Sequence, residues 1–516
     1  MSRRERREAA RRAAAPATAA PVAAPPEPPV PRAGLWLALA FLVPNLGALW
    51  CGFVYDDVPL IVDNERLHSL SRLGEVVTGG YWPDRAGLTL YRPVTQGLQA
   101  LLWAAGGGSP LPFHATNLLL GTAVVLLVHR LLLSLRVPAR TAFLASLLFA
   151  LLPVHTEATT AIVGVSELLA AGFGVGALLL YRSGRRLAAL GLYALAVFSK
   201  ESGAAVAGLA FLLPFVEPGP RPAWKRLATD AAGAGAVVGL ALLARRLVAF
   251  GPDFVPPVDN PMSLIHPLQR ILTALWTQVL YVRQCLFPVV LSADYSYKQV
   301  PLVMGPDDAR AWAGIALLVL AAWAFRYRPR ARVPILLWAV PFLPAANLLM
   351  PVGTVMGERL AYLPSLGLCL GLCLLAAPLL LRLPRQEVVV GAIAVLFAAR
   401  SAVRNLDWRS ADTFYPKLAV TSPGSAKVWY FLGCWKAARE DDPGALAAYD
   451  EAIRIFQPYP EAWNNRAGTL LRLGRSDEAK ESYRQAVRFD PGHKAAAASL
   501  QAMEAGIPFT AKRPRV

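Results

Sequence analysis

The sequence predicts an all-α membrane protein, in which a polytopic helix bundle is followed by a small domain of helical repeats. Three observations support this fold class. Hydrophobic residues make up 55% of the 516-residue chain and charged residues only 17%, whereas soluble domains carry about 45–50% apolar residues even with glycine counted. The apolar residues gather in long runs separated by short charged loops. Residues 420–516 are more polar and show an internal repeat.

The long apolar runs are predicted as transmembrane helices, because a helix that crosses a bilayer needs about 20 apolar residues. Eleven runs meet or approach this length: 34–51, 113–135, 139–157, 161–181, 187–201, 203–217, 227–249, 308–326, 333–350, 361–381 and 386–403. The segment 264–291 is apolar but interrupted by Arg270, Gln278, Arg283 and Gln284. We expect it to be re-entrant or to lie along the membrane interface. Residues 88–105 are a similar candidate for a partial helix.

The loops between these runs sort by charge. One set is basic and contains Arg136, Arg140, Arg182, Arg185, Arg186, Arg221, Lys225, Arg226, Arg326, Arg328, Arg330, Arg332, Arg382 and Arg385. The other set is acidic or mixed and contains Asp56, Asp57, Asp63, Glu65, Asp253, Asp259, Asp294, Asp307 and Asp308. Basic loops favour the cytoplasmic side. The pattern therefore predicts a multi-pass protein of the inner membrane with a cytoplasmic N-terminus, and it accounts for the net charge of +18 without nucleic acid.

The same patterns divide the chain into segments. Residues 1–32 are predicted to be a disordered basic tail, residues 33–403 the membrane domain, residues 404–425 a linker, residues 426–505 the repeats and residues 506–516 a tail. The five cysteines show neither metal-ligand spacing nor a disulfide framework.

The repeats have a period of 34 residues, which is typical of tetratricopeptide repeats. Four pairs of residues show it: Trp429 and Trp463, Ala445 and Ala479, Tyr449 and Tyr483, and Ala452 and Ala486. We expect the two tryptophans and two tyrosines to pack helix against helix. Because three or more repeats are usually needed for a stable stack, residues 404–425 or 494–505 are candidates for extra helices. Such stacks bind extended peptides or partner proteins in a concave groove.

An acidic pair, Asp56 and Asp57, lies in the predicted extracytoplasmic loop 53–92, directly after the first apolar run. Carboxylates at this position are candidates for a general base or a cation site, although Asp is also common in turns. Other ionisable residues fall at the same predicted membrane face: Arg92, His114, His155, Glu157, Glu167, Lys200, Glu201, Asp294, Glu358 and Arg359.

Structural roles are open for several of these residues. His114 is a candidate helix cap and His155 a candidate interface anchor. The neighbours Lys200 and Glu201 are candidates for neutralising each other, as are Glu358 and Arg359. The convergence of all of them on one face favours a site. Carboxylates beside cations at a lipid boundary suit a lipid-phosphate donor and a hydroxyl acceptor.

Several short motifs occur along the chain in a fixed order. They are Phe53-Val-Tyr-Asp-Asp57, Tyr91-Arg-Pro-Val94, Phe113-His-Ala-Thr-Asn117, Pro153-Val-His-Thr-Glu157, Ser199-Lys-Glu201, Leu291-Ser-Ala-Asp-Tyr295, Pro341-Phe-Leu-Pro-Ala-Ala-Asn347, Glu358-Arg-Leu-Ala-Tyr-Leu-Pro-Ser365, and Arg404-Asn405 with Asp407-Trp-Arg409. Over roughly residues 35–490 the chain resembles the transmembrane and tetratricopeptide-repeat-containing O-mannosyltransferases in their bacterial form, which belong to the C superfamily of polytopic glycosyltransferases. It departs from them at Gly164-Val-Ser-Glu167, where the family usually has a basic residue after the glycine.

The resemblance implies an enzyme that moves a sugar, usually mannose, from a polyprenyl-phosphate donor to a protein hydroxyl on the extracytoplasmic side. Transfer in such enzymes inverts the anomeric configuration, and the acidic pair is their catalytic centre. We therefore expect Asp56 to be the base and Asp57 to assist it. We expect Arg359 to bind the donor phosphate, because its planar fork can make two parallel hydrogen bonds, with Glu358 orienting it.

Further substrate contacts are expected from Arg92, Lys200, Glu201, His155, Glu157 and Asp294. The acceptor protein or peptide is expected to bind through the repeats. No cofactor or metal is expected, with a divalent cation as the less favoured option. Two alternatives remain: a non-catalytic membrane scaffold or transporter whose repeats recruit periplasmic partners, and a transferase that acts on lipid-linked glycans.

Overall fold

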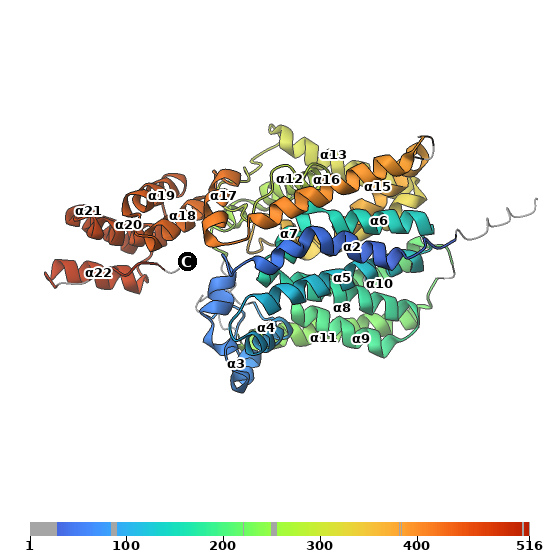
Figure 1. The fold of residues 1–516 in the computed structure, drawn as a ribbon, viewed down its shortest axis with the longest axis horizontal. Helices are drawn as coiled ribbons and strands as arrows, with labels where there is room; N and C mark the ends of the chain where they lie inside the picture. The colour runs from blue at the N-terminus through green and yellow to red at the C-terminus, as the bar shows by residue number, and fades with distance from the viewer. Residues whose placement is uncertain are drawn as a thin grey trace, which may run out of the picture.

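The computed structural model describes residues 28–83, 90–219, 221–248, 255–380, 382, 384–507 and 510–514. Every regular element in this part of the chain is helical, so the all-α fold class is confirmed. Figure 1 shows a long helix bundle with a smaller helical array at one end. Most of the predicted basic tail, and Asp253 of the acidic loops, lie outside the described residues.

Each of the eleven apolar runs forms a helix, because a run without periodic polar residues can bury or expose apolar side chains on every face. These helices are α2 (Ala33–Asn45), α5 (Leu111–Ser134), α6 (Ala139–Leu151), α8 (Val165–Arg182), α9 (Arg186–Ser199), α10 (Ala205–Val216), α11 (Trp224–Val248), α13 (Ala309–Tyr327), α14 (Arg332–Phe342), α15 (Ser365–Leu380) and α16 (Gln386–Leu406).

Six helical segments of the described chain are long and apolar enough to cross a membrane: Ala33–Trp50, Leu111–Ser134, Ile162–Arg182, Trp224–Val248, Ala309–Tyr327 and Gln386–Leu406. A seventh arises if α6 and Pro153–Thr159, which are bent by 51° relative to each other, form one broken span. Shorter apolar helices cover Arg186–Ser199, Glu201–Val216 and Ser365–Leu379. The chain is therefore a multi-pass membrane protein, and eleven crossings remain a prediction.

The two segments expected to be partial helices are α4 (Pro93–Gly106) and α12 (Pro267–Leu286). Both begin with proline, whose fixed φ suits the first helical position. The polar residues of α12 face other parts of the protein: Trp338 Nε1 donates to Gln278 Oε1 at 3.2 Å, and Arg270 donates to the Leu349 carbonyl at 3.0 Å. Protein contacts thus engage Gln278 and Arg270, two of the residues that interrupt this apolar segment.

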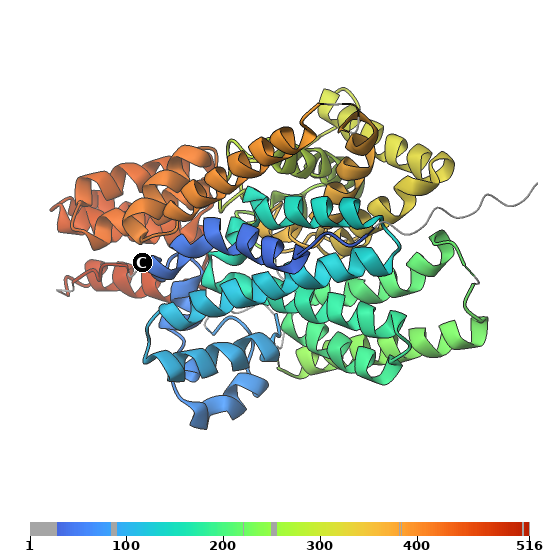
Figure 2. The same cartoon turned by 45° about the vertical axis from the view of Figure 1, so that its right-hand side comes forward.

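The basic loops meet at one end of the bundle. Arg182 pairs with Glu217 at 2.6 Å, Arg136 donates to the Pro218 carbonyl at 3.4 Å, and Arg140 lies 4.0 Å from Glu387. These contacts join the loops that follow α5, α8, α10 and α15. The segments α3 (Leu73–Thr78) and α4, and the repeats, lie at the opposite end, as Figures 1 and 2 show. The structure thus separates the two ends as the charge pattern predicts.

The repeats comprise α18 (Ala426–Ala438), α19 (Asp442–Ile455), α20 (Pro460–Arg472) and α21 (Ser476–Phe489). Both candidate segments for extra helices are helical, forming α17 (Ala411–Thr421) and α22 (Lys494–Glu504). Residues 404–425 therefore hold the end of α16 and a further helix, where a linker was expected.

The repeat tyrosines are core residues, as predicted, since Tyr449 and Tyr483 are buried. A side chain at Gly433 would meet the Tyr449 ring at 2.5 Å, so the two helices approach closely there. The repeat tryptophans are only partly buried. Each donates from Nε1 to a carbonyl six residues upstream, Trp429 to Pro423 at 2.9 Å and Trp463 to Gln457 at 2.8 Å. These hydrogen bonds tie each tryptophan to the segment before the first helix of its repeat.

The repeats are attached directly to the loop that carries the acidic pair. Tyr55 packs against Phe414 and Phe431, with ring centroids 5.4 Å and 5.3 Å apart. Backbone hydrogen bonds join the segment before the repeats to the membrane domain, from Lys298 N to the Gly424 carbonyl at 2.8 Å and from Ala426 N to the Tyr297 carbonyl at 2.6 Å. Loop 53–83 and the first repeat therefore form one packed unit.

Candidate functional site

The acidic pair lies in a tight turn between the end of the first helix and a short helical turn, Val58–Val62. Tyr55 has a left-handed backbone, with φ of 57°. Asp57 is buried, and both of its carboxylate oxygens are engaged: one accepts from Val54 N at 3.2 Å and the other from Val163 N at 3.0 Å. Asp57 therefore ties the loop to the turn before α8, and each of its oxygens accepts a backbone hydrogen bond.

Burial raises the pKa of Asp57 to about 7, although the backbone donors at Val163 and Val54 lower it and only partly compensate. The neighbouring Asp56 carboxylate also raises this pKa. The raised pKa favours the protonated form of Asp57, which reduces the repulsion between the two carboxyl groups. The Asp56 carboxylate faces the guanidinium of Arg359.

Asp56 faces Arg359, with Oδ2 and Nη1 3.5 Å apart. Arg359 is the second residue of the 3₁₀ turn Glu358–Ala361, which lies between α14 and α15. Its backbone N–H donates to Glu157 at 2.9 Å, and its Nε lies 3.5 Å from the other oxygen of Glu157. Burial opposes the charge of Arg359, but Glu157 and Asp56 outweigh it and raise its pKa. Glu157 thus orients the guanidinium toward Asp56.

The expectation that Glu358 orients Arg359 is wrong. Glu358 is completely buried and accepts from Tyr295 Oη at 2.6 Å, and its Oε2 lies 3.6 Å from Arg404 Nη2. Successive side chains of a 3₁₀ turn point about 120° apart, so Glu358 and Arg359 face different surroundings. Burial raises the pKa of Glu358 to about 7, against the lowering effect of Arg404.

Arg404 was not among the predicted site residues. The signal that could have found it is an ionisable residue in the last turn of an apolar helix, which needs a partner at that depth. Arg404 also pairs with Asp407, at 2.8 Å.

The idea that Lys200 and Glu201 neutralise each other is also wrong. Lys200 pairs with Glu167 of α8, and Glu201 pairs with Arg92 at 2.7 Å. The cause is local: Lys200 has an extended backbone at the end of α9, whereas Glu201 begins a 3₁₀ turn, so their side chains diverge.

Lys200, Arg92 and Arg359 form one group of cations. Burial lowers the pKa of Lys200, and the charges of Arg92 and Arg359 lower it further, although Glu167 opposes them. Arg92 also lies over the Tyr81 ring, 4.7 Å from its centroid.

The segment Gly164–Glu167 is where the sequence departs from the pattern of the family that it resembles. Gly164 packs closely on the Ala158 carbonyl, and Val165, at the position of the expected basic residue, is buried.

Two predicted site residues lie apart from the acidic pair and serve as supports. His155 is buried, with Nε2 2.8 Å from Ser365 Oγ, and its ring packs against Tyr362. Asp294 accepts from Tyr55 Oη at 3.1 Å through one oxygen, and from Ser425 Oγ at 2.7 Å through the other. Asp294 therefore joins the loop of the acidic pair to the first repeat. His114 is buried in the first turn of α5.

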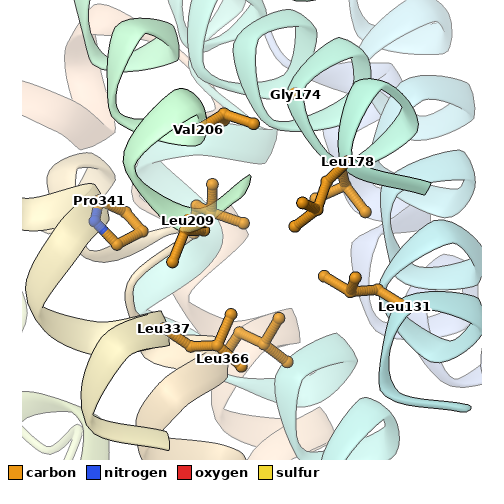
Figure 3. Close-up of a pocket in the computed structure, with 10 residues that line it drawn as sticks. Leu131, Gly174, Leu178, Val206, Leu209, Leu337, Pro341 and Leu366 are labelled. Carbon is orange, nitrogen blue, oxygen red and sulfur yellow. The ribbon is translucent and has the colours of Figure 1, made fainter. Parts of the chain in front are cut away.

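A small apolar pocket lies inside the bundle (Figure 3). Its lining includes Leu131, Leu178, Val206, Leu209 and Leu366. The acidic pair is not part of it. Within the described part of the chain, His, Cys, Asp and Glu side chains form no group of three or more that could hold a metal ion.

Comparison with known proteins identifies relatives of this chain. The family model described as "Protein O-mannosyl-transferase TMTC, DUF1736" matches residues 251–322, which include α12 and Asp294, and a tetratricopeptide-repeat model matches residues 460–493. Protein O-mannosyl-transferase TMTC3 of Mus musculus is 28% identical over 84% of this chain and 52% of its own length. Its Drosophila melanogaster counterpart is 29% identical over 89% and 59%, and TMTC4 of Homo sapiens 28% over 77% and 63%.

The chain is a homologue of the TMTC proteins. The resemblance drawn from its motifs is thereby confirmed. This TMTC homologue spans about half the length of the first curated relatives that it matches, 52%, 53% and 59%.

Proposed function

We propose that this chain is a membrane glycosyltransferase that moves mannose from a polyprenyl-phosphate donor to a protein hydroxyl, with inversion of the anomeric carbon. The observation that supports the proposal is the Asp56–Arg359 pair, in which a carboxylate suited to act as a base faces a guanidinium suited to bind a phosphate. The printed names of the relatives, protein O-mannosyl-transferases, supply the sugar and the kind of acceptor.

Asp56 has the properties of the base. Its side chain is 15% exposed, and its neighbour Asp57 carries the structural hydrogen bonds of the loop. In the proposed step the acceptor oxygen forms a bond to the anomeric carbon while the bond from that carbon to the phosphate oxygen breaks. The hydroxyl proton passes to Asp56, and polyprenyl phosphate leaves with the bonding electrons.

The cation group suits the leaving phosphate. The Arg359 side chain is 31% exposed and keeps donors free for a ligand beside its carboxylate partners. Arg92 and Lys200 lie close enough to Arg359 for the three charges to interact, since Arg92 and Arg359 both lower the pKa of Lys200. Positive charge aimed at a phosphate stabilises the charge that develops on it during transfer. These side chains can supply that charge themselves, so we propose no metal; a divalent cation is the less favoured option, which a chelator tests.

The hydrocarbon part of the donor suits the bundle. The outer surface of the bundle exposes many large apolar residues, which can contact the lipid chain of the donor as well as the bilayer. We further propose that the end carrying Asp56 and the repeats is extracytoplasmic, in the inner membrane, because the basic loops gather at the other end.

The decisive experiment is transfer by the purified chain in lipid vesicles from a radiolabelled mannosyl-phosphoryl polyprenol, with and without an acceptor peptide rich in Ser and Thr. Label should move to the peptide and free polyprenyl phosphate should appear in equal amount. Label moving only to a second lipid-linked glycan would favour the glycan transferase. Absence of transfer to any acceptor, with the donor still bound, would favour the scaffold or transporter.

A further inference from the structure

Residues Thr510–Pro514 lie across the repeats, although α22 has already ended at Glu504. A Cβ atom at Gly468 of α20 would be 3.2 Å from Ala511 Cβ, so this segment passes directly over α20. The segment therefore has a defined place on the repeats.

Arg513 anchors the segment in a site formed by Ala437, Glu440, Asp442 and Arg472, which we call the arginine site. Its Nη1 and Nη2 donate to the two oxygens of Asp442, at 2.9 Å and 3.1 Å. The same Nη1 donates to the Ala437 carbonyl at 2.6 Å. Glu440 adds a carboxylate 4.0 Å from Nε.

Two independent features make this site suitable for arginine. The parallel pair of hydrogen bonds to Asp442 matches the planar guanidinium fork, which lysine cannot reproduce. The Ala437 carbonyl lies in the last turn of α18, where the helix dipole favours a positive charge. Asp442 is also held in place from the other side by Arg472 Nε, at 2.9 Å, so its carboxylate keeps one orientation and one cationic partner when Arg513 leaves.

We propose that the arginine site docks an extended segment of a partner protein that carries an arginine, and that residues 510–514 fill the site when no partner is bound. The anchor is one side chain that is still 31% exposed. Such a contact is weak by itself, and attachment to α22 compensates by giving the segment a high local concentration. A partner segment with the same arginine and more contacts along the repeats displaces it.

The proposal extends the partner role of the repeats, and its test needs no transfer activity, so its failure and that of the glycosyltransferase proposal are distinguishable. The probe is a fluorescent peptide with the sequence of residues 507–514. Its anisotropy is measured against the purified intact chain and against a variant that ends at Gly506. The shortened chain should bind at least tenfold more tightly, because its site is vacated. Arg513→Ala in the intact chain should have the same effect without shortening it.

The peptide itself supplies the variant that cannot fail through misfolding. Replacement of its arginine by alanine or by lysine should weaken binding to the shortened chain at least tenfold. Asp442→Asn in the shortened chain should do likewise. Asp450→Asn is the matched control, because Asp450 pairs with Arg466 at 2.6 Å elsewhere on the repeats, and it should leave binding unchanged. Equal binding of the arginine and alanine peptides, or no binding to the shortened chain, would overturn the proposal.

Discussion

Asp56 and Arg359 are 303 positions apart in the sequence, yet Oδ2 of one lies 3.5 Å from Nη1 of the other. The contact joins the turn after the first helix to the 3₁₀ turn before α15. Glu157, from a third segment, holds the Arg359 backbone and side chain. Three loops at one end of the bundle thus meet at one carboxylate and one guanidinium, and a change in any of them alters the geometry of the proposed site.

Asp56→Asn keeps the size of the side chain and removes the base. We expect it to lower turnover by about 10²–10⁴-fold, the usual contribution of general-base catalysis. Because the donor phosphate is proposed to bind Arg359, donor affinity should change little. Single-turnover transfer and equilibrium donor binding, measured on the same preparation, check the two halves of this expectation.

Asp57→Asn is the matched control. An asparagine can accept only one of the two backbone hydrogen bonds that Asp57 accepts from Val54 and Val163. We expect a lower melting temperature and a smaller loss of turnover than in Asp56→Asn. If Asp57→Asn is the inactive variant and is stable, the roles within the pair are reversed. Full activity of both variants and of the double variant would remove the acidic pair from the mechanism.

Arg359→Ala should weaken donor binding about tenfold or more, since a hydrogen-bonded ionic contact contributes roughly 1.5–3 kcal/mol. Glu157→Gln should weaken donor binding less, because Glu157 only orients the guanidinium. Glu358→Gln is the control: Glu358 faces Tyr295 and Arg404, so donor affinity should stay unchanged. A loss in Glu358→Gln as large as in Arg359→Ala would contradict this division of roles.

The contribution of Glu358 and Asp57 to stability should fall as pH rises from about 4 to above 7. Burial raises the pKa of Glu358 from 4.5 to about 7 and that of Asp57 from 3.8 to about 7 in the folded chain. Between these limits the folded state binds more protons than the unfolded state, and linkage then lowers the free energy of unfolding with each step up in pH. The stabilisation is complete below the unfolded pKa values and is lost above about pH 7.

Thermal unfolding in detergent at about pH 5 and about pH 8 measures this effect. Glu358→Gln should remove the part of the loss that ionisation of Glu358 causes. Its melting temperature at about pH 8, relative to that at about pH 5, should therefore be higher than in the unchanged chain. Glu387→Gln, at an exposed position on the opposite end of the bundle, should leave the difference as it is. An unchanged difference in Glu358→Gln would show that other groups govern the pH dependence.

Alkaline phosphatase fusions test which end faces the cytoplasm. Fusions after residue 420 should be active and fusions near Arg328 inactive, because the enzyme folds only outside the cytoplasm and the basic loops favour the inside. The reverse pattern would put Asp56 on the cytoplasmic side and end the proposal of extracytoplasmic transfer.

The sequence predicted the helices well and the pairing of charges poorly. Apolar runs and the 34-residue period are local patterns, so the positions of α5, α8 and the repeats could be read directly. The sequence also singled out Asp56 and Arg359, which the structure brings together, since ionisable residues at the ends of apolar runs are few. Which acid meets which base depends on side-chain direction in short turns, and sequence distance does not encode it.

Glu358 and Lys200 show this limit. Each has an oppositely charged neighbour in the sequence, and each turns away from that neighbour to a partner on another helix, Arg404 and Glu167 respectively. The hydrogen bonds of Asp294 could not be predicted for the same reason, because its partners Tyr55 and Ser425 are 239 and 131 positions away.

Asp294 is expected to transmit the position of the repeats to the catalytic loop. One carboxylate oxygen accepts from Tyr55 Oη, next to Asp56, and the other accepts from Ser425 Oγ. Ser425 caps α18, since its Oγ also accepts from Val428 N at 3.2 Å. A shift of α18 therefore moves the hydrogen bond that holds Tyr55, and with it the residue before the proposed base.

Tyr55→Phe and Ser425→Ala each remove one arm of this connection, and neither residue is proposed to touch the substrate. We expect each to lower turnover about tenfold, as loss of a hydrogen bond to a charged group would, with donor affinity unchanged. The double variant should lose less than the product of the single losses, because interacting residues couple by about 0.5–3 kcal/mol. Independent, multiplicative losses would show that Asp294 caps the repeats and steadies the loop as two unrelated supports.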